Sequence, residues 1–168
     1  RIVCFNDPTM PLKEPGLSLK NPDGSVFKVR LNNSHLAWLD PSNKEAWQYL
    51  IDIAKEASEL GFDEIQYDYV RFPETTNFKY DMSYLAKEKS EYINEFMQES
   101  VNQLPGVIFS ADIFGSICLQ SKDAGGIGQT LETISAIFPY ISPMIYPSHF
   151  ANNSTTHYTG NGVGTNIN

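Results

Sequence analysis

The sequence predicts an α/β fold of the (β/α)8 TIM-barrel type, and three observations support this prediction. First, short apolar runs that suit buried strands each close on a polar side chain; the closing residues are Asp7, Asp40, Asp68, Asp112 and Tyr146. Second, these residues lie 33, 28, 44 and 34 residues apart, and one β-crossover-β unit takes about 30 or more residues. Third, helical periodicity separates several of the runs. Barrels and doubly wound sheets gather their chemistry at the carboxyl ends of their strands, so we expect an enzyme.

The length bounds the domain organisation. A chain of 168 residues fits one domain with a sizeable core. A complete eight-stranded barrel takes about 200 or more residues, and this chain begins at Arg1 directly before an apolar run. We therefore expect residues 1–168 to form a single catalytic-domain fragment whose barrel is incomplete.

The N-terminal quarter departs from a simple alternation of strands and helices. Residues 2–6 are apolar and suit a first strand. No helical period follows them. Instead, the turn Asn21-Pro-Asp-Gly24 between two short apolar runs predicts a β-hairpin insertion near 17–30. The next strand is expected at 36–40, so an excursion replaces the first helix.

The helix after this strand has the clearest start and stop signals. Ser42 and Glu45 suit a capping box at its N-terminus. Apolar residues then recur at spacings of three and four, namely Trp47, Leu50, Ile51, Ala54, Ala57 and Leu60. Gly61 occupies the position of a C-terminal cap.

The strand expected at 62–70 alternates in polarity. Ile65, Tyr67 and Tyr69 share one face, which we expect to pack on helices as core. Gln66 and Asp68 share the other face and are expected to point into the barrel.

The remaining elements follow the same rhythm. Apolar periodicity and turn residues predict a helix at 83–103, a strand at 107–114, a shorter helix at 129–138 and a strand at 140–146. An Asn, Thr and Gly-rich tail at 151–168 has no apolar period and is expected to be loop-like.

Composition excludes some partners. The net charge is −8, the pI is near 4.8 and the basic residues form no stripe, so we expect no nucleic-acid partner. No apolar run approaches the roughly 18 to 20 residues of a transmembrane segment. Cys4 and Cys118 lie in or beside strand-like runs without ligand spacing and read as two buried thiols. The oligomeric state is not indicated.

Motifs for cofactor and metal chemistry are missing. The three His, at positions 35, 149 and 157, show no HExxH-like spacing, and no loop is dense in carboxylates. The sequence has no G-x-S-x-G elbow, P-loop or dinucleotide fingerprint. The sequence therefore predicts neither a cofactor nor a metal site.

Four blocks carry a family resemblance: WLDP at 38–41, GFDEIQYDYVRFP at 61–73, SADIFG at 110–115 and SPMIYPSH at 142–149. In this order they closely resemble a bacterial family of glycosidase-like domains, grouped with the glycoside-hydrolase-like TIM barrels. The resemblance implies a (β/α)8 barrel of which this chain holds strands two to six. It implies a glycosidase-like activity on a carbohydrate and no particular substrate. We expect the substrate to be a polysaccharide or cell-envelope glycan outside the cytoplasm. The segment after residue 149 fits the family pattern less well.

The expected catalytic residues are two carboxylates. Glycosidic cleavage uses one carboxyl group as acid and another as nucleophile or base. Asp68 and Asp112 end neighbouring predicted strands, where adjacent backbones lie about 4.8 Å apart. We predict Asp68 as nucleophile or anionic stabiliser, paired with Arg71, and Asp112 as the general acid, with Glu74 as the alternative acid.

Seven further residues are predicted to bind substrate: Asp7, Trp38, Asp40, Arg71, Glu74, Tyr146 and His149. Three of them have an equally simple structural interpretation. Asp7 suits turn formation before a proline, Asp40 suits the N-terminus of the following helix, and Trp38 suits the core as well as a sugar-stacking platform.

Two other functions fit the same residues. A catalytically idle barrel would bind glycan without cleaving it. A metal-assisted polysaccharide deacetylase would hold a divalent ion between Asp68 or Asp112 and His149.

Overall fold

A computed structural model describes residues 1–31, 34–74, 79–119, 122–123 and 125–146. The predicted site residue His149 and the predicted tail at 151–168 lie outside these ranges.

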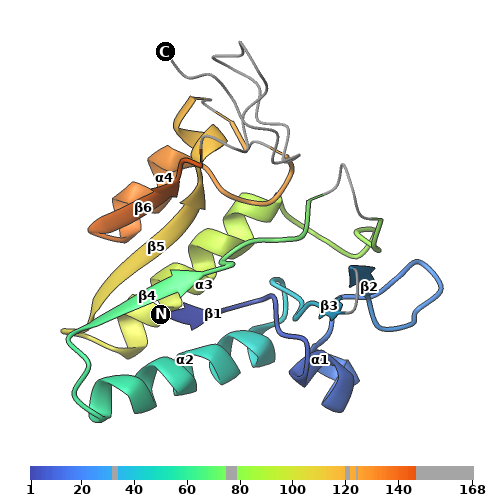
Figure 1. Ribbon diagram of the computed structural model, residues 1–168, viewed down its shortest axis with the longest axis horizontal. Coiled ribbons are helices and arrows are strands. Elements are labelled where there is room, and N and C mark those ends of the chain that lie inside the picture. The colour runs from blue at the N-terminus through green and yellow to red at the C-terminus, as the bar shows by residue number, and fades with distance from the viewer. Residues whose placement is uncertain (32–33, 75–78, 120–121, 124, 147–168) are drawn as a thin grey trace.

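The described chain is built on a four-stranded parallel sheet in the order β1-β4-β5-β6 (Figure 1). The strands are β1 Ile2–Val3, β4 Glu64–Asp68, β5 Ile108–Phe114 and β6 Tyr140–Met144. Each successive pair is parallel, as expected for a chain that crosses over through helices. The fold is thus of the TIM-barrel type, and its barrel is not closed.

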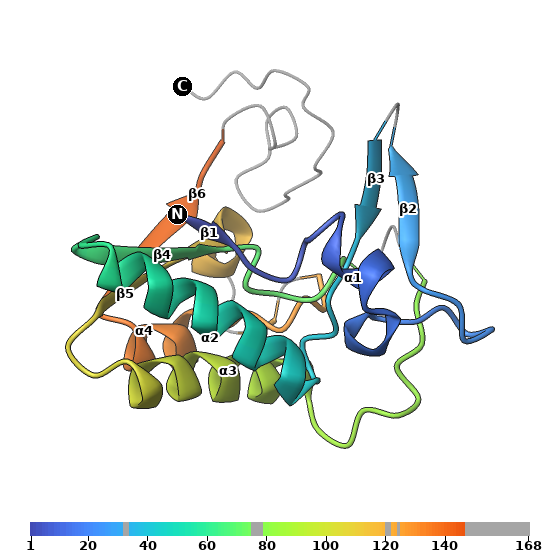
Figure 2. The same cartoon turned by 90° about the horizontal axis from the view of Figure 1, so that it is seen from below.

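Three helices lie along one side of this sheet (Figure 2). They are α2 Lys44–Glu59, α3 Lys89–Gln103 and α4 Leu131–Ile137. The opposite face of the sheet carries the polar side chains described below. This two-faced arrangement follows from the alternation of side chains along each strand.

Aromatic packing fills the space between sheet and helices. Tyr67 on β4 has 0% exposure and stacks on Phe96 of α3 at a ring-centroid distance of 5.3 Å. Phe109 on β5 contacts both Tyr67 and Phe138, at 5.2 Å each. Burial of large aromatic side chains contributes on the order of 1.5 to 3 kcal/mol each, so this cluster anchors the strands from behind the polar face.

The strand expected at 36–40 does not join the parallel sheet, which corrects the predicted count of five strands. Instead, β3 Ser34–Ala37 pairs antiparallel with β2 Lys28–Leu31. β1 pairs directly with β4, so no strand is inserted between them. The last part of the run keeps sheet-like contacts, because the Leu39 amide donates to the Phe5 carbonyl at 2.8 Å and an isolated antiparallel bridge joins Leu39 to Ser18.

The region between β1 and β2 contains a turn and two short helices. The Asn21 amide donates to the Ser25 carbonyl at 2.8 Å, and an isolated antiparallel bridge joins Lys20 and Val26. The short helices are α1 Met10–Lys13 and the 3-10 helix η1 Pro15–Leu17.

Two helix starts differ from the sequence prediction. The N-cap of α2 is Asn43, whose side chain accepts from the Glu45 amide at 2.8 Å. Ser42 instead donates through its hydroxyl to Asp40 at 2.7 Å, so the predicted capping box is wrong. Helix α3 begins at Lys89 because Glu88 forms a capping box with Glu91, six residues after the predicted start.

The cysteines are both unpaired thiols. Cys4 is buried and Cys118 is half-buried in the short helix η2 Gly115–Leu119. Within the ranges the structure describes, no helix combines the length and apolar character needed to cross a membrane.

Candidate active site

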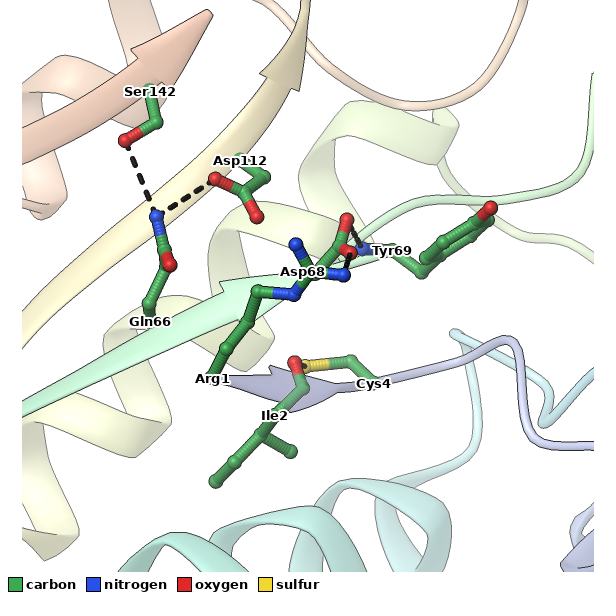
Figure 3. A network of polar contacts seen from close by, with 8 residues as sticks. All are labelled: Arg1, Ile2, Cys4, Gln66, Asp68, Tyr69, Asp112 and Ser142. Atoms are coloured by element: carbon green, nitrogen blue, oxygen red, sulfur yellow. Dashed lines mark hydrogen bonds and ion pairs between the residues drawn. The ribbon is translucent and has the colours of Figure 1, made fainter. Parts of the chain in front are cut away.

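Asp68 ends β4 and is 4% exposed. Its Oδ2 lies 3.1 Å from Nη2 of Arg1, and its Oδ1 accepts from the Tyr69 amide at 2.8 Å (Figure 3). The ion pair of Asp68 is therefore with Arg1, which corrects the predicted pairing with Arg71. A guanidinium and a backbone N–H are both hydrogen-bond donors that suit a carboxylate oxygen.

The backbone bends at Tyr69, directly after Asp68. Tyr69 has φ of 51°, a left-handed conformation that costs a non-glycine residue free energy and is concentrated at functional sites. The bend breaks the alternation of β4. Tyr69 consequently lines the polar cleft, and Val70 is buried at 0% exposure. The prediction that Tyr69 shares the core face of Tyr67 is wrong for this reason.

Asp112 lies on the neighbouring strand β5, on the same side of the sheet as Asp68 (Figure 3). The β4–β5 ladder ends at Tyr67 opposite Ala111, so Asp68 and Asp112 each follow directly after its last pair. Gln66 donates to Asp112 Oδ1 at 2.8 Å and to Ser142 Oγ of β6 at 3.3 Å. Three adjacent strands thus place polar side chains on one surface.

The electrostatic environment sets the two carboxyl groups apart. Asp112 is 7% exposed. Burial raises the pKa of Asp112, and the negative charge of Asp68 raises it further, whereas the positive charge of Arg1 opposes the rise. The two carboxyl groups therefore have different surroundings, because Asp68 contacts a guanidinium whereas Asp112 accepts a hydrogen bond from the Gln66 amide.

These residues line one cleft with a volume of about 600 Å³. Its lining residues are Arg1, Gln66, Asp68, Tyr69, Arg71, Glu74, Asp112, Phe114, Ser142, Pro143, Met144, Ile145 and Tyr146. Five residues predicted from the sequence for catalysis or substrate binding are therefore together: Asp68, Arg71, Glu74, Asp112 and Tyr146.

Arg71 is held among aromatic rings at the edge of this cleft. Its guanidinium carbon lies 4.4 Å from the ring centre of Phe114, 4.9 Å from that of Tyr69 and 5.2 Å from that of Trp38. Its Nη1 donates to the Phe72 carbonyl at 3.0 Å. Stacking and hydrogen bonding therefore fix the orientation of this cation.

Trp38 is among the predicted substrate-binding residues that do not line the cleft. It is 2% exposed, and its indole N–H donates to the Arg71 carbonyl at 3.0 Å. A ring so deeply buried offers no face on which a sugar can stack. Trp38 instead supports Arg71 and Tyr69 from behind, which corrects its predicted role as a platform.

Asp7 and Asp40 also lie outside the cleft lining, and each accepts hydrogen bonds from the backbone of residues that follow it. Asp7 Oδ1 accepts from the amides of Thr9 and Met10, at 2.7 and 2.9 Å. Asp40 accepts from Ser42 and, at 2.7 Å, from the Tyr84 hydroxyl, and its negative charge adds to burial in raising the pKa of Tyr84. These contacts correspond to the structural interpretations, namely turn formation for Asp7 and bracing of the segment before α2 for Asp40.

Eight residues that line the cleft were not assigned to the site from the sequence: Arg1, Gln66, Tyr69, Phe114, Ser142, Pro143, Met144 and Ile145. The period of two placed Gln66 in phase with Asp68 on β4 and Ser142 in phase with Tyr146 on the last strand, and this signal was sufficient to find them. Arg1 and Tyr69 carried no such signal. Their positions depend on the β1–β4 pairing and on one backbone angle.

The described residues contain no group of three His, Cys, Asp or Glu side chains arranged as metal ligands. His149, on which the deacetylase alternative depends, is outside them.

The fold and the carboxylates at its strand ends define the class of this domain, a TIM-barrel type α/β domain. Several solved structures share the fold. A hypothetical protein from Ruminiclostridium thermocellum is 51% identical with a TM-score of 0.59, over 67% of this chain and 56% of that one. The α-galactosidase TtGalA from Thermus thermophilus matches with a TM-score of 0.57 at 14% identity, over 96% of this chain and 29% of its own. An α-amylase from Lactobacillus plantarum matches with a TM-score of 0.51 at 17% identity, over 83% of this chain and 30% of its own.

The chain belongs to the family described as "Putative glycosyl hydrolase domain", which matches residues 1–162. The match continues past residue 149, which corrects the weaker fit expected for the last segment. The chain spans 56% of the length of the first solved protein above, 29% of the second and 30% of the third. No curated protein matches it.

Proposed function

We propose that this domain is a glycosidase that cleaves a polysaccharide or cell-envelope glycan by a two-carboxylate mechanism. The observation that carries the proposal is the pairing of Asp68 and Asp112 on adjacent strands, in one cleft of about 600 Å³ and in different electrostatic environments. Membership of a glycosyl hydrolase family supports the reaction class. The similarity to α-galactosidase and α-amylase structures supports the fold on which the site is built.

Asp68 acts as the nucleophile or anionic stabiliser. Its carboxylate receives a charge-assisted contact from Arg1 and a backbone hydrogen bond from Tyr69. Both contacts hold negative charge where positive charge develops on the sugar ring in the transition state.

Asp112 acts as the general acid that protonates the leaving oxygen. An acid is most useful when its pKa lies nearer the operating pH than that of an ordinary carboxyl group. The raised pKa of Asp112 meets this requirement, and its cause is burial together with the charge of Asp68. Gln66 fixes the carboxyl group through the 2.8 Å hydrogen bond to Oδ1.

The cleft is lined by both polar and apolar side chains, which suits a sugar ring. Arg1, Gln66 and Ser142 offer hydrogen-bond donors and acceptors, and Phe114 and Met144 contribute apolar surface. Carbohydrates present hydroxyl groups at their edges and C–H groups on their faces, so both kinds of side chain are used when a sugar binds.

The decisive experiment compares Asp68→Asn and Asp112→Asn on the hydrolysis of envelope and plant glycans, with products resolved by chromatography. We expect each substitution to lower kcat by about 10²- to 10⁴-fold while oligosaccharide binding persists, because general acid and covalent catalysis contribute on this order. Asp63→Asn, at an exposed carboxylate in the turn before β4, is the matched control and should leave turnover unchanged.

Unchanged turnover by Asp68→Asn on a confirmed substrate would remove Asp68 from the mechanism. Binding without cleavage by the wild-type chain would instead support the idle barrel. The configuration of the product also reports the mechanism. Placement on adjacent strands favours a carboxyl separation of about 5 to 5.5 Å, and this separation predicts retention of the anomeric configuration. NMR of the freshly released product measures that configuration.

A further inference from the structure

The two strands that carry the candidate acids have no ladder contact beyond the site. The β4–β5 register runs from Glu64 opposite Ile108 to Tyr67 opposite Ala111. After Asp68 the chain turns away at Tyr69, while β5 continues to Phe114. Another element must therefore set the spacing of the strand ends.

The side chain of Gln129 bridges this gap. It is 0% exposed and is not among the residues that line the cleft. Its Oε1 accepts from the Phe114 amide at 3.1 Å, and its Nε2 donates to the carbonyls of Val70 at 3.2 Å and of Asp112 at 3.3 Å. One buried amide thus joins the backbone after Asp68 to the backbone of the other candidate acid, with both donor hydrogens and its acceptor used.

The loop that presents Gln129 is itself fixed to the fold. Asp123 accepts from the amides of Ile127 and Gly128, at 3.0 and 2.7 Å, and the Phe72 amide donates to the Ile127 carbonyl at 2.8 Å. Gly128 has φ of 84°, and a Cβ there would lie 2.9 Å from the Lys89 carbonyl oxygen and from Ile93 Cγ1. The loop therefore packs closely against α3 at Gly128, where a larger residue would not fit.

We infer that Gln129 is a positioning residue for the reaction, which sets the distance and orientation between Asp68 and Asp112 without touching substrate. This inference rests on the proposed function. Buried polar networks that are fully satisfied specify a single arrangement of the groups they join. Displacements near 1 Å away from the chemistry can lower rates about 10²-fold, so such a brace has a catalytic consequence.

Gln129→Met tests this inference because methionine keeps the length of the side chain and removes its hydrogen bonds. We expect kcat to fall by about 10- to 100-fold with KM within about twofold. We also expect the pKa of the Asp112 carboxyl, followed by ¹³C NMR titration, to move down toward the ordinary Asp range, because the strand ends separate and Asp68 acts on it less.

Two further variants keep the test falsifiable. Gln129→Glu retains the acceptor for the Phe114 amide and serves if the methionine variant does not fold. Trp47→Phe is the matched structural control. Trp47 lies on α2, away from the cleft, and the substitution removes its buried indole hydrogen bond to the Pro41 carbonyl. It should lower the melting temperature without changing kcat or the Asp112 pKa.

The inference is overturned if both Gln129 variants lose thermal stability but keep the wild-type kcat and Asp112 pKa, as the Trp47 control does. The NMR titration needs no substrate. A chain that proves inactive on all glycans would therefore end the proposed hydrolysis, while a displaced Asp112 pKa in Gln129→Met would still support the brace.

Discussion

At the scale of single residues, the site depends on the backbone bend at Tyr69. Tyr69 leaves the strand conformation directly after Asp68, so the Asp68 carboxylate can accept from the following amide while the Tyr69 ring turns to the cleft. Two residues after the bend, Arg71 lies among three aromatic rings. A regular strand would have returned Tyr69 to the core and buried its hydroxyl group at a cost.

The coupling between the two acids is itself testable. Asp68→Asn removes a negative charge that raises the pKa of Asp112, so we expect that pKa to fall in the variant, measured by ¹³C NMR titration. Asp63→Asn should leave it unchanged. An unaltered or higher Asp112 pKa in Asp68→Asn would show that the two carboxyl groups do not sense each other.

The raised pKa also fixes the sign of the pH effects. Asp112 must be protonated to act as the acid, so activity should decline as pH rises through its folded-state pKa. Because the folded state binds this proton more tightly than the unfolded chain, the associated stabilisation is complete below the unfolded pKa. It is lost as pH rises through the folded pKa.

At the scale of elements, the neighbouring side chains of Ser42 and Asn43 have different roles at the start of α2. Asn43 caps the helix by accepting from the Glu45 amide, whereas Ser42 binds Asp40. We expect Asn43→Ala to lower the free energy of unfolding by about 1 kcal/mol in urea titrations, since an N-terminal cap contributes about 0.5 to 2 kcal/mol.

Hydrogen exchange separates capping from a general loss of stability. The Glu45 amide should exchange faster in Asn43→Ala, because it loses the Asn43 side chain as its acceptor, and should keep its protection in Ser42→Ala. Faster exchange at Glu45 in the serine variant instead would restore the capping role that the sequence pattern suggested for Ser42.

At the scale of the whole molecule, the sheet is open. Within the described ranges, β6 pairs with β5 along one of its edges. Tyr140, the first residue of β6, and Ile145, which follows the strand, are each 58% exposed. An unpaired strand edge with apolar side chains favours association with another chain.

We therefore expect this 168-residue chain to self-associate with rising concentration in sedimentation velocity experiments. Tyr140→Lys places a charge on the edge strand and should weaken the association roughly tenfold. Leu60→Lys, at a residue 74% exposed beyond the end of α2, is the control and should have little effect. A monomer at every concentration, or equal effects of both substitutions, would show that the edge of β6 does not mediate contact.

Much of the architecture was predictable because it depends on local pattern. The period of two in β4 placed Gln66 and Asp68 on the face opposite Tyr67, and the structure confirms this arrangement. The periods of three and four predicted α2 and α3; the cap of α2 was wrong by one residue, and α3 begins six residues after its predicted start. Local side-chain alternation and helical periodicity are properties of neighbouring residues, so the sequence expresses them directly.

The sequence by itself determined the α/β class, the polar face of the sheet and the two acids at its carboxyl ends. The tertiary structure alone decided that Arg1 pairs with Asp68, that Trp38 supports Arg71 from behind, and that the run after residue 33 forms a hairpin. The physical reason is that pairing partners are chosen among residues far apart in the chain. Strand neighbours, buried hydrogen-bond acceptors and ion pairs compete in space, and local sequence pattern does not record the outcome of that competition.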